Sequence, residues 1–343
     1  LLVYNRLTHS VSIHQIMNTY PTEVFRDLGF KHIPSERSIY RALEKVGRLF
    51  PVLLERYQLF LKKYDLADDK QFIDFSSSYF EGTKSELGAY GYSKDKRADK
   101  MQVEFGISTG LNEIPTALTI QKGNMNDKKH MNEILNIVPR VIPKNSMLIF
   151  DTGGNTKKNK NKIKAMGYHY LTLKPKKISP YKKELSYFKK QYDAKNVEII
   201  KIDDNIYYCA KMKVENEIHY IYFSNDLYRI QIHEKNKKFK KQIEKGNKIL
   251  RRRKRDLYPS EEGWVELVPE LQKTLEEIEN PYFTGLEGFF ILESSVDGDS
   301  EHILKLYKDR DKAEKFIRAI KEGLELRPIR HWNQNSIKGL FFI

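Results

Sequence analysis

The sequence predicts an α/β fold in which a mixed five-stranded sheet is flanked by helices. The first observation behind this prediction is the order of strand-like and helix-like segments between residues 70 and 175, which is β-β-β-α-β-α-β. Three consecutive strands followed by alternating helices and strands are typical of a sheet with both antiparallel and parallel neighbours. The second observation is size, because 343 residues, 40% of them hydrophobic, are enough to form a substantial core.

Residues 1 to about 66 precede this region and are predicted to be helical. The segment SERSIYRALEKVGRLFPVLLERYQLFLKKY has apolar residues at spacings of three and four, opens with Ser35 as an N-cap and is interrupted only at Pro51. Arg37, Arg41 and Lys45 would allow a helix pair here to dock on DNA. A helical packing module explains the same pattern at least as well, so both interpretations stay open.

Each predicted strand and helix between residues 70 and 175 has its own pattern. In MQVEFGIST, the apolar residues Val103, Phe105 and Ile107 alternate with other residues, which indicates a strand. The helix NDKKHMNEILNIV has Asn126 as its predicted N-cap. The other predicted strands are QFIDFSS, IPTALTIQKG, SMLIFD and YHYLTLKP, and the other predicted helix is the lysine-rich TKKNKNKIKAMG.

Residues 176 to about 300 depart from this alternation and are predicted to form an insertion. The segment VEIIKIDDNIYYCAKMKVENEIHYIYFS contains four β-type runs with turn-like residues between them, which indicates an antiparallel piece. The stretch that follows is predicted to be helical and is very basic, with twelve lysines or arginines and one glutamate between residues 235 and 255. Arg251, Arg252 and Arg253 within it are candidate DNA-binding residues, and a solvated helix face is the alternative.

The overall charge favours a polyanionic partner. Lysines and arginines exceed aspartates and glutamates by 61 to 46, a formal net charge of +15, and nucleic acid is a natural partner for such a chain. Simple solubility is the competing interpretation. The single Cys209 excludes a disulfide framework and a CxxC metal knuckle, as expected in a reducing cytosol.

Membrane association is not expected. No apolar run approaches the roughly 18 residues of a membrane span, and no secretory signal pattern is present. The first residue is Leu1, and the sequence ends within the apolar run IKGLFFI. We therefore expect the sequence to be part of a longer protein.

The segment YKDRDKAEKFIRAIK, residues 307–321, is predicted to be a helix with a polar line beside a buried stripe. At 100° per residue, Tyr307, Arg310, Glu314 and Lys321 share an arc of about 60°. The adjoining sector is apolar and contains Leu306, Ala313, Phe316, Ile317, Ile320 and Leu324. A helix packed by this stripe would hold Glu314 at the edge of the buried zone.

Three carboxylates form the predicted metal site. Asp74 interrupts the first apolar strand, Asp151 ends the fourth, and the carboxyl ends of sheet strands are where α/β folds build sites. With Glu314 they would supply three hard oxygen donors, which suit Mg²⁺ or Mn²⁺ better than zinc. Two such ions about 4 Å apart can activate an attacking oxygen and stabilise the leaving oxygen in phosphodiester transfer.

Alternative interpretations exist for this carboxylate set. Asp74 and Asp151 also fit ordinary turn or cap residues, since FDTGGNT on its own reads as a strand followed by a glycine turn. The polar line of Glu314 also holds donors suited to phosphate oxygens, since arginine binds phosphate as a fork and lysine binds it as a point charge. These donors are Tyr307, Arg310 and Lys321. The alternative metal ligands are Asp95, Asp99, Glu104 and Asp127.

The element order and the motifs together resemble the ribonuclease H-like catalytic core of DDE transposases. The helix at residues 307–321 is similar to the Tyr-x2-Arg-x3-Glu-x6-Lys signature of the IS-four group of insertion-sequence transposases. Four further segments resemble motifs of that family: DFSSSYFEG, GYSKDKRADKMQ, GNMNDKK and LELRPIRHWNQNSIKG. Leu340 departs from the pattern, because we expect the family to favour histidine there. The resemblance covers about residues 70 to 343.

This resemblance implies roles for individual residues. Asp74, Asp151 and Glu314 would be the catalytic, metal-binding triad for two Mg²⁺ or Mn²⁺ ions, and Tyr307, Arg310 and Lys321 would grip phosphates of the transposon end. It also implies four regions: an incomplete helical N-terminal region at 1–66, the ribonuclease H-like core at 67–175 and, truncated, at 300–343, and a β-rich, basic insertion at 176–299.

The implied function is transposition. Such an enzyme would act as a homodimer on double-stranded DNA with terminal inverted repeats, cleave the element ends and join them to target DNA in a prokaryotic cytoplasm, associated with the nucleoid. Two other functions stay open. One is a catalytically inactive DNA-binding remnant, and the other is a metal-dependent nuclease that cleaves without joining.

Overall fold

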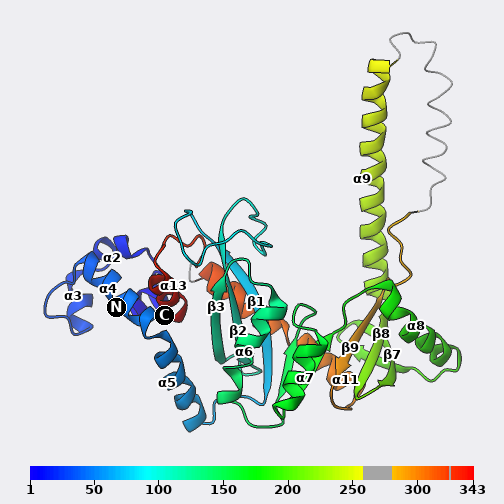
Figure 1. Ribbon diagram of the computed structural model, residues 1–343, viewed down its shortest axis with the longest axis horizontal. Helices are drawn as coiled ribbons and strands as arrows, with labels where there is room; N and C mark the ends of the chain where they lie inside the picture. Colours follow the sequence, from blue (N-terminus) through cyan, green and yellow to red (C-terminus); the bar gives the residue numbers. More distant parts are fainter. Residues whose placement is uncertain (258–279, 324–325) are drawn as a thin grey trace. The chain divides into compact units, whose positions relative to one another are not determined.

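A computed structural model describes residues 1–257, 280–323 and 326–343, and the side chains of these residues except 247–257. The chain divides into two compact units. Unit 1 consists of Leu1–Leu173, Ser294–Val296 and Leu304–Ile343, and unit 2 consists of Lys174–Glu293 and Asp297–Ile303. Figure 1 labels many of the elements of both. The four regions predicted from the sequence stay a prediction.

The N-terminal part of unit 1 is helical, as predicted. Ser35 caps one of these helices, because its side chain accepts a hydrogen bond from the Ser38 backbone N–H. The predicted interruption falls at Leu49, between α4 and α5, and Pro51 occupies the first turn of α5, where its missing N–H costs nothing. The helices are α1 (Leu2–Thr8), α2 (Ile13–Thr19), α3 (Thr22–Asp27), α4 (Glu36–Arg48) and α5 (Phe50–Lys63).

Five neighbouring strands of a mixed sheet lie in unit 1, which confirms the predicted α/β fold class with a mixed sheet flanked by helices. Their order is β3-β2-β1-β4-β5. β1 pairs antiparallel with β2, β2 pairs antiparallel with β3, and β4 runs parallel to both β1 and β5. The strands are β1 (Lys70–Tyr79), β2 (Gln102–Gly110), β3 (Pro115–Lys122), β4 (Met147–Phe150) and β5 (His169–Leu173).

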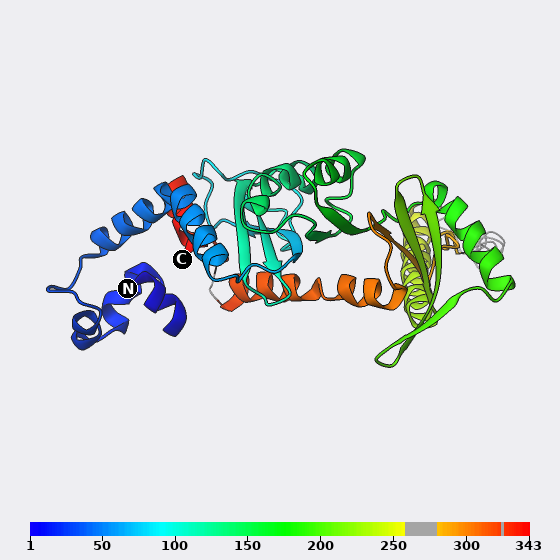
Figure 2. The ribbon, with the colours of Figure 1, turned by 90° about the horizontal axis from the view of Figure 1, so that it is seen from below.

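Helices cover both faces of this sheet. On one face, α6 (Asp127–Ile134) and α7 (Lys157–Ala165) pack on a cluster that includes Ile73, Phe75 and Phe150. Asn126 caps α6 as predicted, and a short 3-10 helix, η1 (Val138–Arg140), follows α6. On the opposite face, α12 (Asp311–Arg318) contacts β1 and β2. Figure 2 shows α12 in orange on one face and the green helices on the other.

The segment predicted as one helix over residues 307–321 is broken in the structure, so that prediction was wrong in part. α11 (Ser300–Lys308) ends before α12 begins at Asp311, and a π-helical turn, η3 (Ala319–Gly323), follows α12. A constant 100° per residue therefore does not hold along the segment, because a π turn takes more residues per turn than an α turn. The predicted stripe is buried at Ala313 and Ile317.

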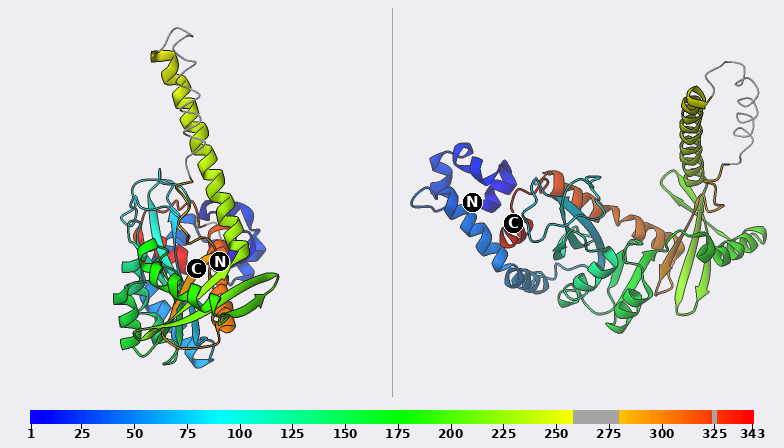
Figure 3. Two further views of the ribbon diagram at one scale, coloured as in Figure 1. Left: turned by 90° about the vertical axis from the view of Figure 1, so that its right-hand side faces the viewer. Right: turned by 45° about the horizontal axis from the view of Figure 1, so that its top comes forward.

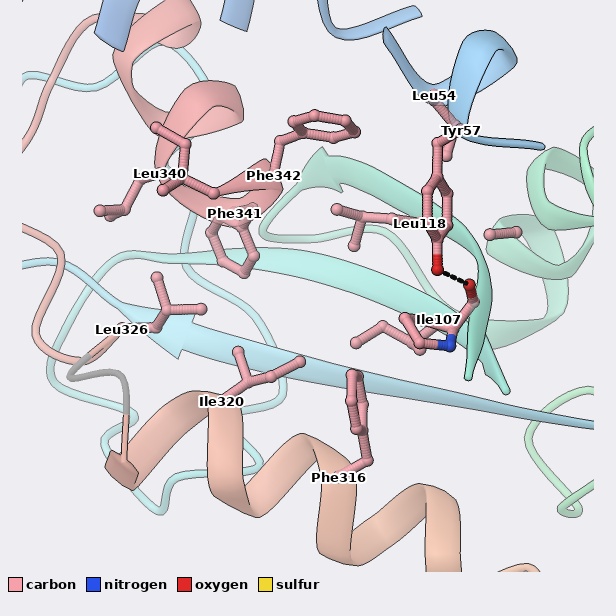
Figure 4. Close-up of a pocket in the computed structure, with 13 residues that line it drawn as sticks. Leu54, Tyr57, Ile107, Leu118, Phe316, Ile320, Leu326, Leu340, Phe341 and Phe342 are labelled. Atoms are coloured by element: carbon pink, nitrogen blue, oxygen red, sulfur yellow. Dashed lines mark hydrogen bonds between the residues drawn. The ribbon is translucent and has the colours of Figure 1, made fainter. Parts of the chain in front are cut away.

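An apolar cavity of about 320 Å³ lies between the sheet and the helices of unit 1. Figure 4 shows Tyr57 of α5, Leu118 of β3 and Phe316 of α12 around it, together with Phe341 from the last helix, α13 (Gln334–Phe342). The Tyr57 hydroxyl donates a hydrogen bond of 2.9 Å to the Pro115 carbonyl. The apolar side chains around the cavity belong to the layer that packs α5, α12 and α13 on the sheet.

Unit 2 contains strands in the order β9-β8-β7-β6 and two long helices. Only three strands occupy the segment predicted to hold four β-type runs, because β7 continues unbroken from Asn205 to Val214. The basic stretch is helical as predicted, and Figure 3 shows it as part of α9. The elements are α8 (Ile178–Asp193), β6 (Glu198–Ile202), β7 (Asn205–Val214), β8 (Glu217–Ser224), α9 (Asn225–Leu257) and β9 (Phe289–Ser294).

Candidate active site

The pairing of β1 with β4 brings the two predicted aspartates together. Ile73 of β1 pairs with Phe150 of β4 in parallel register, so Asp74 and Asp151 occupy the next positions on adjacent strands. Neighbouring strands lie about 4.8 Å apart. Asp151 directly follows the end of β4, where its Oδ1 accepts a 2.6 Å hydrogen bond from the Thr152 backbone N–H.

Asp74 is a poorly compensated carboxylate. Its side chain is only 21% exposed, and its ion pair with Arg310 is long, at 3.9 Å from Oδ1 to Nη1. Burial raises the pKa of Asp74 to about 6, against the opposing effects of Lys94 and Arg310. A carboxylate held in this way favours an additional positive charge beside it.

Arg310 links Asp74 to Glu314. It is the residue before the first turn of α12, and its Nη2 lies 2.5 Å from Glu314 Oε1 in an i,i+4 ion pair. The Arg310 side chain is 16% exposed and that of Glu314 is 44% exposed. The arginine therefore stands between a strand carboxylate and a helix carboxylate, with Glu314 open to solvent.

Tyr307 completes the link to the second aspartate. Its hydroxyl donates a hydrogen bond of 3.4 Å to Asp151 Oδ1. The Arg310 guanidinium lies 5.7 Å from the centre of the Tyr307 ring. Burial, followed by the charge of Asp151, raises the pKa of Tyr307, so its hydroxyl stays a proton donor at neutral pH.

Lys321 lies apart from this chain of contacts, contrary to the shared line predicted for the four residues. It sits in the π-helical turn and is 7% exposed. Its Nζ is 2.5 Å from Asp95 Oδ1 and donates to Ser76 Oγ at 3.1 Å. Arg327 Nη1 donates to the same Asp95 oxygen at 2.7 Å. Lys321 thus has two buried partners in this structure.

Comparison with protein families shows which family the chain belongs to. A family model described as transposase DDE domain matches residues 66–343, which is most of the chain.

The chain belongs to the transposase DDE domain family.

Among solved structures, it is similar to a chain in a cryo-EM structure of a piggyBac transposase synaptic complex with hairpin DNA, at a TM-score of 0.48 and 10% identity. The match covers 99% of this chain and 62% of that one. No curated protein matches. DDE transposases generally use divalent metal ions. Among the described helices of this transposase domain, none is long and apolar enough to cross a membrane.

The three carboxylates of this DDE domain have the donor chemistry for a divalent ion. Oxygen donors from Asp74, Asp151 and Glu314 suit a hard cation, and burial raises the pKa of Asp74. Among the described residues, the three do not form a set whose ligand atoms all lie within 4.8 Å of one another. Since Arg310 contacts both Asp74 and Glu314, it occupies part of the space between them.

Two residues near the three carboxylates were not singled out by sequence reasoning. Lys94 Nζ donates to the Phe75 carbonyl at 2.6 Å and lies 3.2 Å from Asp127 Oδ2. Gly153 allows Asp127 to approach, because a Cβ at that position would lie 2.5 Å from Asp127 Oδ2. The glycine pair after Asp151 was a signal for such a close approach, whereas nothing distinguished Lys94 from its charged neighbours.

The alternative ligands have other partners. Asp95 binds Lys321 and Arg327, and Asp127 lies beside Lys94. Asp99 is exposed and pairs with Arg97 at 2.8 Å. Glu104 is buried, which raises its pKa to about 8.

The predicted DNA-binding arginines lie in α9, but Arg251, Arg252 and Arg253 are outside the residues whose side chains are described. Earlier in the same helix, side chains are described up to residue 246. Five of the lysines there are exposed: Lys237, Lys238, Lys240, Lys241 and Lys245. This part of α9 therefore presents positive charge to solvent.

Proposed function

We propose that this chain is a transposase of the IS-four group that cleaves the ends of its element and joins the freed 3′-hydroxyl to target DNA. One observation carries the proposal. Asp74 and Asp151 occupy adjacent positions at parallel strands, and Tyr307 and Arg310 connect them to Glu314. The family match supports the DDE chemistry in general terms.

The proposed metal ligands are Asp74, Asp151 and Glu314, which would hold two Mg²⁺ or Mn²⁺ ions. When bound, such ions supply an activated nucleophilic oxygen and stabilisation of the leaving oxygen. The chain's own residues position the DNA. Arg310 would turn from the carboxylates to a phosphate, whose oxygens match its planar fork of donors. The Tyr307 hydroxyl, kept protonated by its raised pKa, would donate to a neighbouring phosphate oxygen.

The proposed partners are the terminal inverted repeats of the element and the target DNA, bound by a homodimer. Support comes from the net charge of +15 and from the exposed lysines of α9. Arg251, Arg252 and Arg253 would extend this basic surface, and Lys321 would contact phosphate only after leaving Asp95. Each basic residue that neutralises a phosphate adds to the salt dependence of binding.

Cleavage of DNA carrying the native element ends tests the proposal. Asp74→Ala, Asp151→Ala and Glu314→Ala should each abolish Mg²⁺-dependent cleavage while leaving DNA binding in gel-shift assays largely intact. Asp27→Ala is the matched control, since Asp27 is an exposed aspartate at the end of α3, outside every set of candidate ligands. Near-parental cleavage by any of the three variants would contradict the triad.

Joining is tested separately with pre-cut ends and target DNA. A transposase yields joined products in this assay. Cleavage without joined products would instead identify a nuclease.

A further inference from the structure

A second cluster of potential metal ligands lies in unit 2, on residues with no role in the proposed cleavage. Glu217 and His219 are two residues apart on β8, so their side chains lie on the same face of the sheet. Glu293 is on β9, the neighbouring strand. One ligand atom from each of the three lies within 4.8 Å of the others.

The imidazole of His219 is held by carboxylates on both sides. Its Nε2 lies 3.2 Å from Glu217 Oε1 and 3.7 Å from Glu293 Oε1. Its Nδ1 lies 3.1 Å from Glu184 Oε1, on α8. The His219 side chain is 3% exposed, whereas that of Glu217 is 18% exposed and gives the cluster an opening to solvent.

Both ring nitrogens of His219 lie within hydrogen-bond distance of a carboxylate oxygen, Nδ1 of Glu184 and Nε2 of Glu217. A neutral imidazole that donates its Nδ1–H to Glu184 carries a lone pair on Nε2. That lone pair would face two carboxylate oxygens, which are acceptors as well. The arrangement is repulsive unless a proton or a cation lies between Nε2 and these oxygens.

Glu184 has the position of a carboxylate that orients a metal-bound histidine. Metal-ligating histidines commonly donate the other ring N–H to a carboxylate, which fixes the tautomer and raises the basicity of the ligand nitrogen. Glu184 is itself 3% exposed and also pairs with Lys174. Its second oxygen, Oε2, is buried and has no hydrogen-bond partner among the described residues.

We propose that unit 2 binds one divalent transition-metal ion through His219 Nε2 and one oxygen each of Glu217 and Glu293. One nitrogen and two carboxylate oxygens suit Zn²⁺ or Mn²⁺. The ion would tie β8 to β9, and through the His219–Glu184 hydrogen bond it would also fix α8. The site is independent of the proposed cleavage function, because it shares no ligand with Asp74, Asp151 or Glu314.

Zn²⁺ titration by calorimetry tests this site in the chelator-treated protein. An Asp74→Asn/Glu314→Gln background removes two ligands of the proposed catalytic site, so the ion counted is the one in unit 2. We expect one Zn²⁺ per chain. Adding Glu217→Gln should weaken binding at least tenfold, and adding Glu184→Gln roughly 10- to 100-fold. His302→Gln is the control, because His302 is an exposed histidine outside the cluster.

Two results would overturn the proposal. The first is the absence of saturable binding of either Zn²⁺ or Mn²⁺ by the background protein. The second is unchanged Zn²⁺ affinity in the Glu217→Gln variant.

A measurement on the background protein itself does not depend on the folding of any cluster variant. Nitrogen NMR of the His219 ring should show an unprotonated Nε2 whose signal shifts when Zn²⁺ is added. A ring that stays protonated on both nitrogens at saturating Zn²⁺ would also contradict the site.

Discussion

Replacing Asp74 by asparagine should stabilise the metal-free protein while it removes activity. Burial raises the pKa of Asp74 from 3.8 to about 6, so keeping this group ionised in the folded state costs free energy. The difference of about 2.2 pKa units corresponds to about 3 kcal/mol at 1.36 kcal/mol per unit. Asparagine has the same size and carries no charge, so Asp74→Asn should raise the free energy of unfolding by up to about 3 kcal/mol at pH 7.5.

The pH dependence of this gain follows from the direction of the shift. Well below pH 3.8, Asp74 is protonated in both folded and unfolded states, so the variant and the parent should be equally stable. As the pH rises towards about 6, Asp74 stays protonated in the folded parent while it ionises in the unfolded parent, so the parent becomes less stable than the variant. Above about pH 6, the difference in free energy of unfolding between variant and parent reaches its full size.

Urea unfolding in EDTA, at several pH values, measures the effect. With an m-value of about 3 kcal/mol/M, the midpoint should shift by roughly 1 M at pH 7.5. Glu314→Gln is the contrasting variant, because Glu314 is 44% exposed and its loss breaks the ion pair with Arg310. It should change stability by no more than about 1 kcal/mol. An Asp74→Asn variant no more stable than the parent at pH 7.5 would refute the reasoning.

Three further predictions concern the same unit. Burial raises the pKa of Glu104 from 4.5 to about 8. Glu104→Gln should therefore raise the free energy of unfolding, measured in urea, by up to about 5 kcal/mol at pH 9 and by almost nothing at pH 4. An equal increase at both pH values would contradict this. Gly47→Ala should lower the free energy of unfolding by about 3 kcal/mol or more, because the new Cβ would lie 1.7 Å from the Asn335 carbonyl oxygen. Gly82→Ala is the control, because a Cβ at Gly82 would have nothing within 4 Å. Equal melting temperatures of the two variants would contradict the close crossing of the helices that carry Gly47 and Asn335. Arg310→Ala should lower the slope of log affinity for DNA against log salt by about 0.9, and an unchanged slope would exclude its phosphate contact.

The sheet was predictable because local sequence patterns determine it. Alternating apolar residues gave the strands of unit 1, and their order with the helices gave the mixed sheet that the structure has. The helix N-caps at Ser35 and Asn126 were also predictable, because each side chain bonds a backbone N–H only three residues further along the chain. The break at Asp309 and Arg310 was not predictable from apolar spacing, because the residues on both sides keep a helical pattern and the change is one of backbone geometry.

The candidate site was predictable only as far as strand ends could be recognised. Asp74 stands out because it interrupts the apolar run FIDF, and Asp151 because it directly follows the apolar run MLIF. The burial of Lys321 beside Asp95 depends on a contact between residues more than 200 positions apart. The cluster around His219 was missed for the same reason, since Glu184 and Glu293 come from elements far from β8 in the sequence.

The central claim is that Asp74, Asp151 and Glu314 hold the divalent ions that cleavage requires. The most direct test is cleavage of the element ends by Asp151→Cys in Mg²⁺ and in Mn²⁺. A thiolate is a poor ligand for Mg²⁺ and a better one for softer metals. The account predicts no cleavage in Mg²⁺ and measurable cleavage in Mn²⁺, while parental cleavage rates in Mg²⁺ would contradict it.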